Sequence, residues 1–255
     1  MVKRPFVSEY CGFVQALFIQ HDHLSPPAMV GEALVALGYE LDEFLVVPKE
    51  KFSSPNVKVE LPDYRGYDLL VPMGAPWSVY DTATIGNWVL DELAYLGDAL
   101  DHGVAILGLC FGGQLLAKAT GGDVVRSPAP EIGWHVIHSD QPTSIPSGPW
   151  FQWHYDRIAA PPLATVVARN AAAVQAFRIG RALGLQFHPE IDLATLNGWL
   201  DNGGHEELLE AGLDADVLIR HTEAELVSAR VRTRRLIESF HQEVVLAPAA
   251  SQASA

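Results

Sequence analysis

The chain has 255 residues, of which 49% are apolar, and it carries a formal net charge of −14 at pH 7. It is long enough to bury a large core, and its acidic surface should repel nucleic acid, so we expect no nucleic-acid partner. No apolar run reaches the roughly eighteen residues of a membrane span, and two distant cysteines, Cys11 and Cys110, without a signal peptide favour a reduced, cytoplasmic protein.

Short apolar runs alternate with segments of helical spacing in the first 110 residues. The runs predict buried strands at 14–19, 43–47, 67–72 and 103–109, and the helical spacing predicts helices at 26–38 and 84–103. Alternating strands and helices are typical of a parallel sheet that is covered by helices on both faces. We therefore predict an α/β fold with three layers and an open, mostly parallel sheet.

The pattern changes after Gly122. Segments at 133–139, 164–170, 173–180 and 182–188 are short, partly alternating and closely spaced, which is typical of hairpin-linked or late strands. The pattern is helical again from Asp192, and Thr222 with Glu225 reads as a capping box that begins a long helix. We expect a main domain over 1–200, a helical extension over 201–246 and a disordered tail over 247–255.

Cys110 lies where an apolar strand gives way to a helix, in the stretch GLCFGGQ. In open α/β sheets, ligands bind at the carboxyl ends of the strands. Gly108 and Gly112 leave room for a tight, strained turn that exposes the thiol, and the free amides of the next helix favour a thiolate and can hold an oxyanion. A small buried cysteine is the structural alternative, but the two glycines favour a nucleophile.

A nucleophilic thiol needs a base, and the base needs a group that orients it. His188 ends the apolar segment ALGLQFH, and Glu190 follows two residues later. Both side chains point to the same side if the chain stays extended through Pro189. A surface histidine beside a turn proline would have the same pattern, but the pairing with the Cys110 turn favours a Cys110, His188 and Glu190 triad.

Two other groups of residues have simpler interpretations. The sequence HDH at 21–23 suggests a metal pair, but three adjacent residues in a loop cannot all face one ion, so we expect no metal. We also expect no cofactor. Arginines at 230, 232, 234 and 235 are flanked by Glu223, Glu225 and Glu238, which favours a solvated helix face over a basic binding patch.

Several segments together resemble the class I, triad-type glutamine amidotransferases, among them the amidotransferase domain of GMP synthase and its free-standing relatives. The matching pieces occur in the family's order: VPMGAPWSVYD (71–81), GLCFGGQ (108–114), PEIGWHVI (130–137), FQWHYD (151–156) and QFHPE (186–190). The resemblance implies a flavodoxin-like fold and a glutaminase. Cys110 would attack the side-chain amide of glutamine, His188 would protonate the departing ammonia, and water would hydrolyse the glutamyl thioester.

The resemblance also implies binding residues around this nucleophile. The backbone amides of Ala75 and Phe111 would form the oxyanion hole, and the residues that hold glutamine would be Gly74, Gln114, His154, Tyr155 and Asp156, the last three in a turn. Two departures qualify this. The family commonly has glycine at the position of Ala75, and an alanine at positive φ would cost ~1 kcal/mol, so the loop is expected to be set differently. The family often has glycine at the position of Tyr155, which leaves substrate clamping at that turn open.

The sequence contains no P-loop and no glycine-rich pyrophosphate loop. Either a separate synthetase subunit uses the ammonia, or the chain hydrolyses another γ-glutamyl amide by itself. A hydrolase of the dienelactone type also has Gly-x-Cys-x-Gly-Gly, but it leaves Gln114, EIGW and His-Pro-Glu without a role. A non-catalytic module on the same fold would usually lack a member of the triad, and all three are present.

Overall fold

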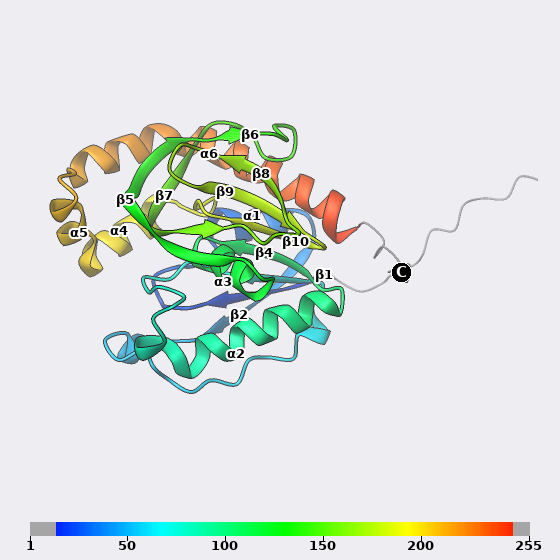
Figure 1. The fold of residues 1–255 in the computed structure, drawn as a ribbon. Coiled ribbons are helices and arrows are strands. Elements are labelled where there is room, and N and C mark those ends of the chain that lie inside the picture. Colours follow the sequence, from blue (N-terminus) through cyan, green and yellow to red (C-terminus); the bar gives the residue numbers. More distant parts are fainter. Residues whose placement is uncertain (1–13, 247–255) are drawn as a thin grey trace, which may run out of the picture.

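The computed structural model describes residues 14–246, which form three layers around an eight-stranded sheet (Figure 1). Its strands are β1 (Val14–Gln20), β2 (Tyr39–Leu45), β3 (Leu69–Pro72), β4 (Ala105–Leu109), β6 (His138–Ser139), β8 (Thr165–Arg169), β9 (Val174–Ile179) and β10 (Ala182–Leu185). The strand order is β2-β1-β3-β4-β10-β9-β8-β6. Neighbours from β2 to β10 pair in parallel, and β9, β8 and β6 continue the sheet antiparallel. The predicted α/β fold with an open sheet is confirmed.

Helices cover both faces of this sheet. The larger ones are α1 (Ala28–Ala36), α2 (Thr82–Asp101), α3 (Phe111–Ala119) and α6 (Ala215–Phe240). Successive residues of a strand face opposite sides, so Phe18 packs in one core with α1 and α6, whereas Leu17 packs in the other with α2 and α3. In Figure 1, α6 runs along one side of the sheet and α2 along the other.

Further elements lie at one end of the sheet. They are the long antiparallel pair β5 (Asp123–Val136) and β7 (Pro149–Ala159), and the helices α4 (Leu193–Trp199) and α5 (His205–Glu210), drawn at the left of Figure 1. Short helical turns complete the described chain at Lys49–Lys51, Tyr64–Gly66, Leu200–Gly204 and His241–Val245. These end elements surround the carboxyl ends of the parallel strands.

The strands β3 and β4 lie within the predicted apolar runs and β1 extends one residue beyond its run, but β2 is displaced from its predicted position. It begins at Tyr39, directly after Gly38 with φ of +90°, and ends at Leu45, whereas the prediction placed it at 43–47. The strand is at the edge of the sheet and pairs only with β1, so all of its side chains except Tyr39 are at least partly exposed, and charged residues interrupt the apolar ones. An edge strand of this kind has no apolar run to reveal it.

Residues 153–156 do not form a turn as predicted. They lie in the middle of β7, where His154 is the antiparallel partner of Glu131 in β5. Side chains along β7 alternate between buried and partly exposed, as expected for a strand with one face on the core. The residues expected to clamp a substrate therefore project from a strand rather than from a loop.

The predicted capping box at Thr222 and Glu225 is wrong. Helix α6 begins eight residues earlier in the chain, where the Asp214 side chain accepts a hydrogen bond from the Val217 amide at 3.1 Å. Thr222 is a buried residue inside the helix, and its hydroxyl accepts a hydrogen bond from the indole N–H of Trp134 at 3.0 Å. Thr222 therefore makes a core contact inside the helix instead of capping its start.

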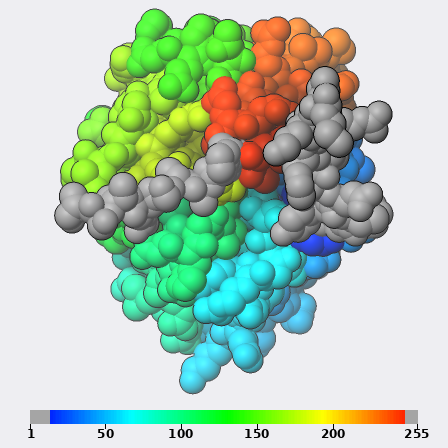
Figure 2. Space-filling view, turned by 90° about the vertical axis from the view of Figure 1, so that its right-hand side faces the viewer, coloured from blue at the N-terminus to red at the C-terminus, as the bar shows by residue number. Residues whose placement is uncertain are grey.

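Helix α6 shares the core of the sheet. Leu236, Ile237 and Phe240 belong to the same apolar cluster as strand residues of β1 and β3. Figure 2 shows the last described residues, in red, beside the yellow-green late strands, where Arg178 pairs with Glu243 at 2.6 Å. The division of the chain into domains at residue 200 stays a prediction. The predicted tail at 247–255 and Cys11 lie outside the described residues.

Candidate active site

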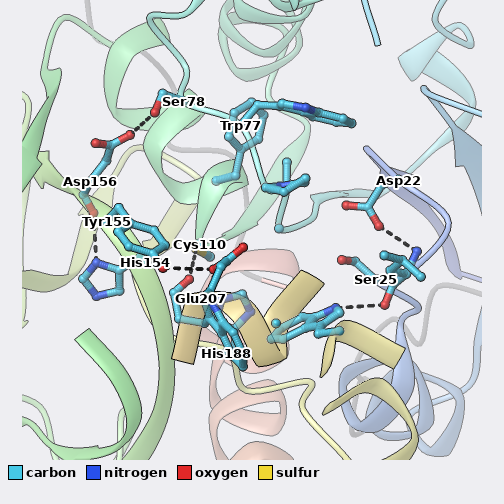
Figure 3. Close-up of a pocket in the computed structure, with 18 of the residues that line it drawn as sticks. Asp22, Ser25, Trp77, Ser78, Cys110, His154, Tyr155, Asp156, His188 and Glu207 are labelled. Carbon is cyan, nitrogen blue, oxygen red and sulfur yellow. Dashed lines mark hydrogen bonds between the residues drawn. The ribbon is translucent and has the colours of Figure 1, made fainter. Parts of the chain in front are cut away.

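A pocket of about 890 Å³, which includes open solvent at its mouth, lies at the carboxyl ends of the parallel strands. Cys110 and His188 lie in its middle, and Asp22 and Ser25 approach them from one side, Asp156 and Ser78 from the other (Figure 3). Pockets of several hundred cubic ångströms typically hold a small molecule. The position agrees with the expectation that ligands gather at the carboxyl edge of the sheet.

Cys110 occupies a strained turn between β4 and α3. Its φ and ψ angles are 49° and −104°, a backbone conformation that residues other than glycine rarely adopt. The turn is possible only because its neighbours are small. A Cβ on Gly112 would lie 1.9 Å from the Pro72 carbonyl oxygen, and one on Gly108 would lie 2.5 Å from the Gly112 carbonyl oxygen. The strained turn predicted from the two glycines is confirmed.

His188 lies beside Cys110 at the end of the segment that follows β10. Its backbone amide donates to the Phe151 carbonyl at 2.8 Å, which ties the segment to β7. Its Nδ1 atom donates to the Glu190 carboxylate at 2.7 Å, and both side chains are buried. Because a carboxylate only accepts, this contact places a proton on Nδ1 and turns Nε2 toward the pocket.

Opposing effects act on the pKa of His188. Burial, the largest, lowers it, but the charges of the Cys110 thiolate and the Glu190 carboxylate and hydrogen bonding raise it, and the net pKa lies well above 6.5. The Nε2 atom is buried and has no hydrogen-bond partner among residues 14–246, although the nearby Cys110 side chain contributes to the raised pKa of the ring. The surroundings of His188 therefore favour its imidazolium form.

The turn that carries His188 and Glu190 is supported from two helices. The Thr233 hydroxyl in α6 donates to the Pro189 carbonyl at 2.7 Å, and the amide of Met29, in the first turn of α1, donates to the Glu190 carbonyl at 3.2 Å. The ring of Trp199 packs edge-on against the His188 ring, with centroids 5.0 Å apart. The orientation of the imidazole is thus fixed by packing as well as by Glu190.

Gln114 and Gln186 lie behind the cysteine. The Gln186 amide nitrogen is 3.8 Å from the Cys110 sulfur, and Gln114 donates to the Asp156 carbonyl at 3.2 Å. Both side chains are buried. Gln114 was a predicted binding residue, whereas Gln186 was not, although it stands in the QFHPE segment. The sequence signal that could have identified Gln186 was its spacing from His188, since side chains two positions apart in an extended segment lie on the same side.

The loop after β3 brings Gly74 and Ala75 to the opposite wall of the pocket. Ala75 and Phe111 both line it, and within residues 14–246 their backbone amides have no acceptor. Among the described residues, positive φ angles outside glycine occur only at Ala28 and Cys110, so Ala75 carries none of the strain considered above. The alanine is accommodated because the loop has an ordinary backbone conformation at that position.

His154, Tyr155 and Asp156 all line the pocket, and each is tied to other residues. The Asp156 carboxylate accepts from Ser78 at 2.5 Å and from Tyr80 at 2.8 Å. The other two side chains contact residues of neighbouring elements: His154 is 3.3 Å from Glu131 in β5, and Tyr155 donates to Glu207 in α5 at 3.0 Å. The pKa of Tyr155 is raised to about 12, first by burial and then by Glu207.

Other pocket residues were not predicted. Glu207, from the helical segment beyond residue 200, accepts hydrogen bonds from both Trp153, at 2.8 Å, and Tyr155. Phe52 and Trp77 form an aromatic part of the pocket lining, with ring centroids 5.8 Å apart. Nothing in their spacing marks them in the sequence, because each reaches the pocket from a separate loop or helix.

The HDH segment at 21–23 and the arginines at 230–235 make separate contacts with other residues. His21 faces Glu92, whereas the Asp22 carboxylate accepts from the Leu24 amide at 2.6 Å. Within residues 14–246, no group of three or more His, Cys, Asp or Glu side chains is arranged to hold a metal ion. Two of the arginines of α6 form ion pairs with glutamates of the same helix, Arg232 with Glu225 at 3.0 Å and Arg234 with Glu238 at 2.7 Å.

Comparison with known proteins places this geometry in a family. The sequence profile of the family described as "Glutamine amidotransferase class-I" matches residues 30–203, more than half of the chain. The chain belongs to the class I glutamine amidotransferases. The resemblance seen in the sequence is thereby confirmed, and the chain is a member of a family of enzymes.

Individual amidotransferases show how far the similarity extends. The chain is 32% identical to one of the subunits of a glutamine-hydrolysing GMP synthase, from Sulfurisphaera tokodaii, over 54% of this chain and 74% of that protein. It is also 32% identical to the glutamine-hydrolysing GMP synthase of Aeropyrum pernix, over 63% of this chain but only 32% of that protein. The similarity thus covers most of the first relative and about a third of the second.

Solved structures agree on the fold. A glutamine amidotransferase from Thermotoga maritima superposes with a TM-score of 0.77 at 25% identity, covering 92% of this chain and all of that one. A glutamine amidotransferase from Methylobacillus flagellatus superposes with a TM-score of 0.79 at 24% identity, covering 91% and 96% of the two chains. Within residues 14–246, the amidotransferase fold has no helix that is both long and apolar enough to cross a bilayer.

Proposed function

We propose that this amidotransferase hydrolyses the side-chain amide of L-glutamine with Cys110 as nucleophile, His188 as acid and base, and Glu190 as the group that orients His188. The observation that carries the proposal is the buried contact of 2.7 Å between His188 and Glu190 beside a cysteine on a strained turn. Such a turn exposes the side chain of the nucleophile to the pocket.

The reaction proceeds through a covalent intermediate. The Cys110 thiolate adds to the amide carbon, and the carbonyl oxygen becomes an oxyanion, which the free amides of Ala75 and Phe111 stabilise. The imidazolium of His188 gives its proton to the amide nitrogen as the carbon–nitrogen bond breaks, so ammonia leaves and a glutamyl thioester remains. Water then adds to the thioester, His188 accepts a proton from it, and glutamate departs as the thiolate is restored.

The remaining pocket residues would bind the amino-acid part of the substrate. Asp156 and Glu207 place carboxylates on the wall of the pocket, where they attract the ammonium group of glutamine. Gly74 leaves space beside His188, since a Cβ there would lie 3.2 Å from its ring. Gln114 and His154 act through the backbone of β7, because both contact the Asp156 carbonyl.

The ammonia would serve a second substrate on a separate synthetase chain. The support is the similarity to a protein that is named as one of the subunits of a GMP synthase. A stand-alone γ-glutamyl amide hydrolase is the second candidate. The observation in its favour is that the pocket extends from Cys110 to Phe52 and Trp77, which leaves room for a substituent on the amide nitrogen.

The test is release of ammonia and glutamate from L-glutamine and from a panel of γ-glutamyl amides by the purified chain. Cys110→Ser should abolish release, and Cys11→Ser, the matched control at the other cysteine, should leave it unchanged. Release that survives in Cys110→Ser would refute the proposal. Preference for substituted amides over glutamine would favour the second candidate. Turnover of simple esters or lactones without turnover of any γ-glutamyl amide would refute both.

A further inference from the structure

His21 is a buried histidine directly behind the loop that carries Gly74 and Ala75. It follows the last residue of β1, and its side chain is fully buried. Its Nε2 atom lies 3.0 and 3.1 Å from the two carboxylate oxygens of Glu92 in α2, and its Nδ1 atom lies 3.2 Å from the Gly74 carbonyl oxygen. The pocket itself is lined by Gly74 and Ala75 but not by His21.

Both ring nitrogens of His21 face acceptors. A carboxylate and a carbonyl oxygen can only accept hydrogen bonds, so both contacts form together only when the ring carries two protons. Burial is the largest influence on the pKa of His21 and lowers it, but Glu92, the Gly74 carbonyl and Asp22 raise it, and the net pKa lies above 6.5. The environment thus supports the imidazolium that the two contacts require.

The contact between His21 and the Gly74 carbonyl fixes the orientation of the whole peptide group that joins Gly74 to Ala75. A trans peptide group is planar, and its C=O and N–H point in opposite directions. The peptide that joins Gly74 to Ala75 is trans, like every peptide bond in the described residues. Within residues 14–246, His21 is the one hydrogen-bond partner of the Gly74 carbonyl. When that carbonyl points to His21, the Ala75 amide must point away from His21.

Ala75 lines the pocket together with Cys110 and His188. Gly74 is packed between two histidines: its carbonyl oxygen contacts His21, and a Cβ on it would approach Cε1 of His188. We infer that His21, held by Glu92, is a positioning residue that aims the Ala75 amide at the oxyanion formed on Cys110. This inference rests on the proposed function only for the use of the Ala75 amide as an oxyanion donor.

Packing alone does not explain the polar contacts. The His21 ring stacks on Trp88 with centroids 5.6 Å apart and meets Phe111 edge-on at 4.8 Å, and a phenylalanine could make the same contacts. A buried carboxylate in α2 opposite such a ring would then be costly. A histidine paired with Glu92 is instead suited to orient a carbonyl group.

The experiment compares two reactions of Cys110 that differ in their need for an oxyanion donor. In acylation by 4-nitrophenyl acetate, the thiolate adds to the ester carbon and an oxyanion forms. The 4-nitrophenolate then leaves, and an acetyl thioester remains on the sulfur of Cys110. In alkylation by iodoacetamide, the thiolate displaces iodide from carbon, and no oxyanion forms. The ratio of the two rates therefore reports the oxyanion hole apart from the reactivity of the thiol.

Two double variants test the contact. His21→Phe with Glu92→Leu keeps the ring stacking and removes both polar groups, whereas His21→Asn with Glu92→Gln keeps a donor near the position of Nδ1. His241→Phe is the matched control, because it removes a buried histidine contact of 2.8 Å with Tyr39 at the start of β2 far from Cys110. All three variants are compared with the full wild-type chain.

We expect acylation to fall about 10- to 100-fold in the Phe/Leu variant, part of the effect of losing an oxyanion donor, while alkylation stays within about twofold. The Asn/Gln variant should recover most of the acylation rate, and His241→Phe should change neither reaction. Unchanged acylation in the Phe/Leu variant, or an equal fall in both reactions, would overturn the inference. Because neither probe contains glutamine, a wild type without glutamine hydrolysis would refute the proposed function and leave this test intact.

Discussion

The contact between His188 and Glu190 gives a quantitative prediction for Glu190→Gln. The substitution keeps the size of the side chain but removes a buried negative charge 2.7 Å from Nδ1. A hydrogen bond to a charged group contributes about 1.5–3 kcal/mol, which corresponds to a fall of roughly 1–2 units in the pKa of His188. Loss of the orienting carboxylate should also lower kcat by about 10²- to 10⁴-fold.

The sign of the pH effect follows from the raised pKa. His188 acts as an acid while it is protonated, so turnover falls as pH rises through its pKa. In Glu190→Gln this basic limb of kcat/KM should move to lower pH by about 1–2 units, while alkylation of Cys110 by iodoacetamide survives at least in part.

The assay is a pH profile of glutamine hydrolysis beside a profile of alkylation. The control is Glu131→Gln, which removes a buried carboxylate next to another histidine, His154, and should leave the basic limb in place. A basic limb that stays at the wild-type pH in Glu190→Gln would refute the assignment of Glu190 as the group that raises the pKa of His188.

Three further predictions concern stability and support of the site. Gly112→Ala should cost more than about 4 kcal/mol of unfolding free energy in denaturant titration, because its Cβ would meet a backbone oxygen of β3, whereas Gly198→Ala, which has open space, should be neutral or stabilising. Thr233→Val should lower both kcat and stability, the latter by about 1–3 kcal/mol, and Thr222→Val on the same helix should lower stability alone. His21 has a raised pKa, so its contribution to stability is complete below about pH 6.5 and is lost as pH rises through that pKa. As pH rises, the unfolding free energy of the double variant His21→Phe, Glu92→Leu should therefore decline less than that of the wild type.

Features that depend on local sequence were predictable. The strands β1, β3 and β4 are apolar because both faces of the sheet are covered, and the two glycines around Cys110 are required by backbone contacts within the turn. His188 and Glu190 also meet within a local segment, although Pro189 and Glu190 form a turn rather than the extended chain assumed from the sequence. In each case the constraint acts within a few residues of the pattern that reveals it.

Features that depend on distant contacts were not predictable. Strand β2 has polar residues because it is an edge, and Thr222 mimics a helix cap because it meets Trp134, 88 residues away in sequence. The role inferred for His21 depends on Glu92 and Gly74, which lie 71 and 53 residues away. A single sequence gives no sign of such partners, because both the spacing and the residue types are compatible with an ordinary loop.

The support of the His188 turn by α6 also sets an order on the assembly of the site during protein synthesis. Thr233 follows Glu190 by about 40 residues, which at about 5–20 residues per second takes about 2–8 s to synthesise. During that interval Cys110, His188 and Glu190 all exist in the nascent chain, but the Pro189 carbonyl between the last two lacks its donor, and one face of the sheet is covered by α1 without α6. A chain released before α6 is complete would carry every reactive group of the pocket but would lack the hydrogen bond from Thr233 that supports the turn between His188 and Glu190.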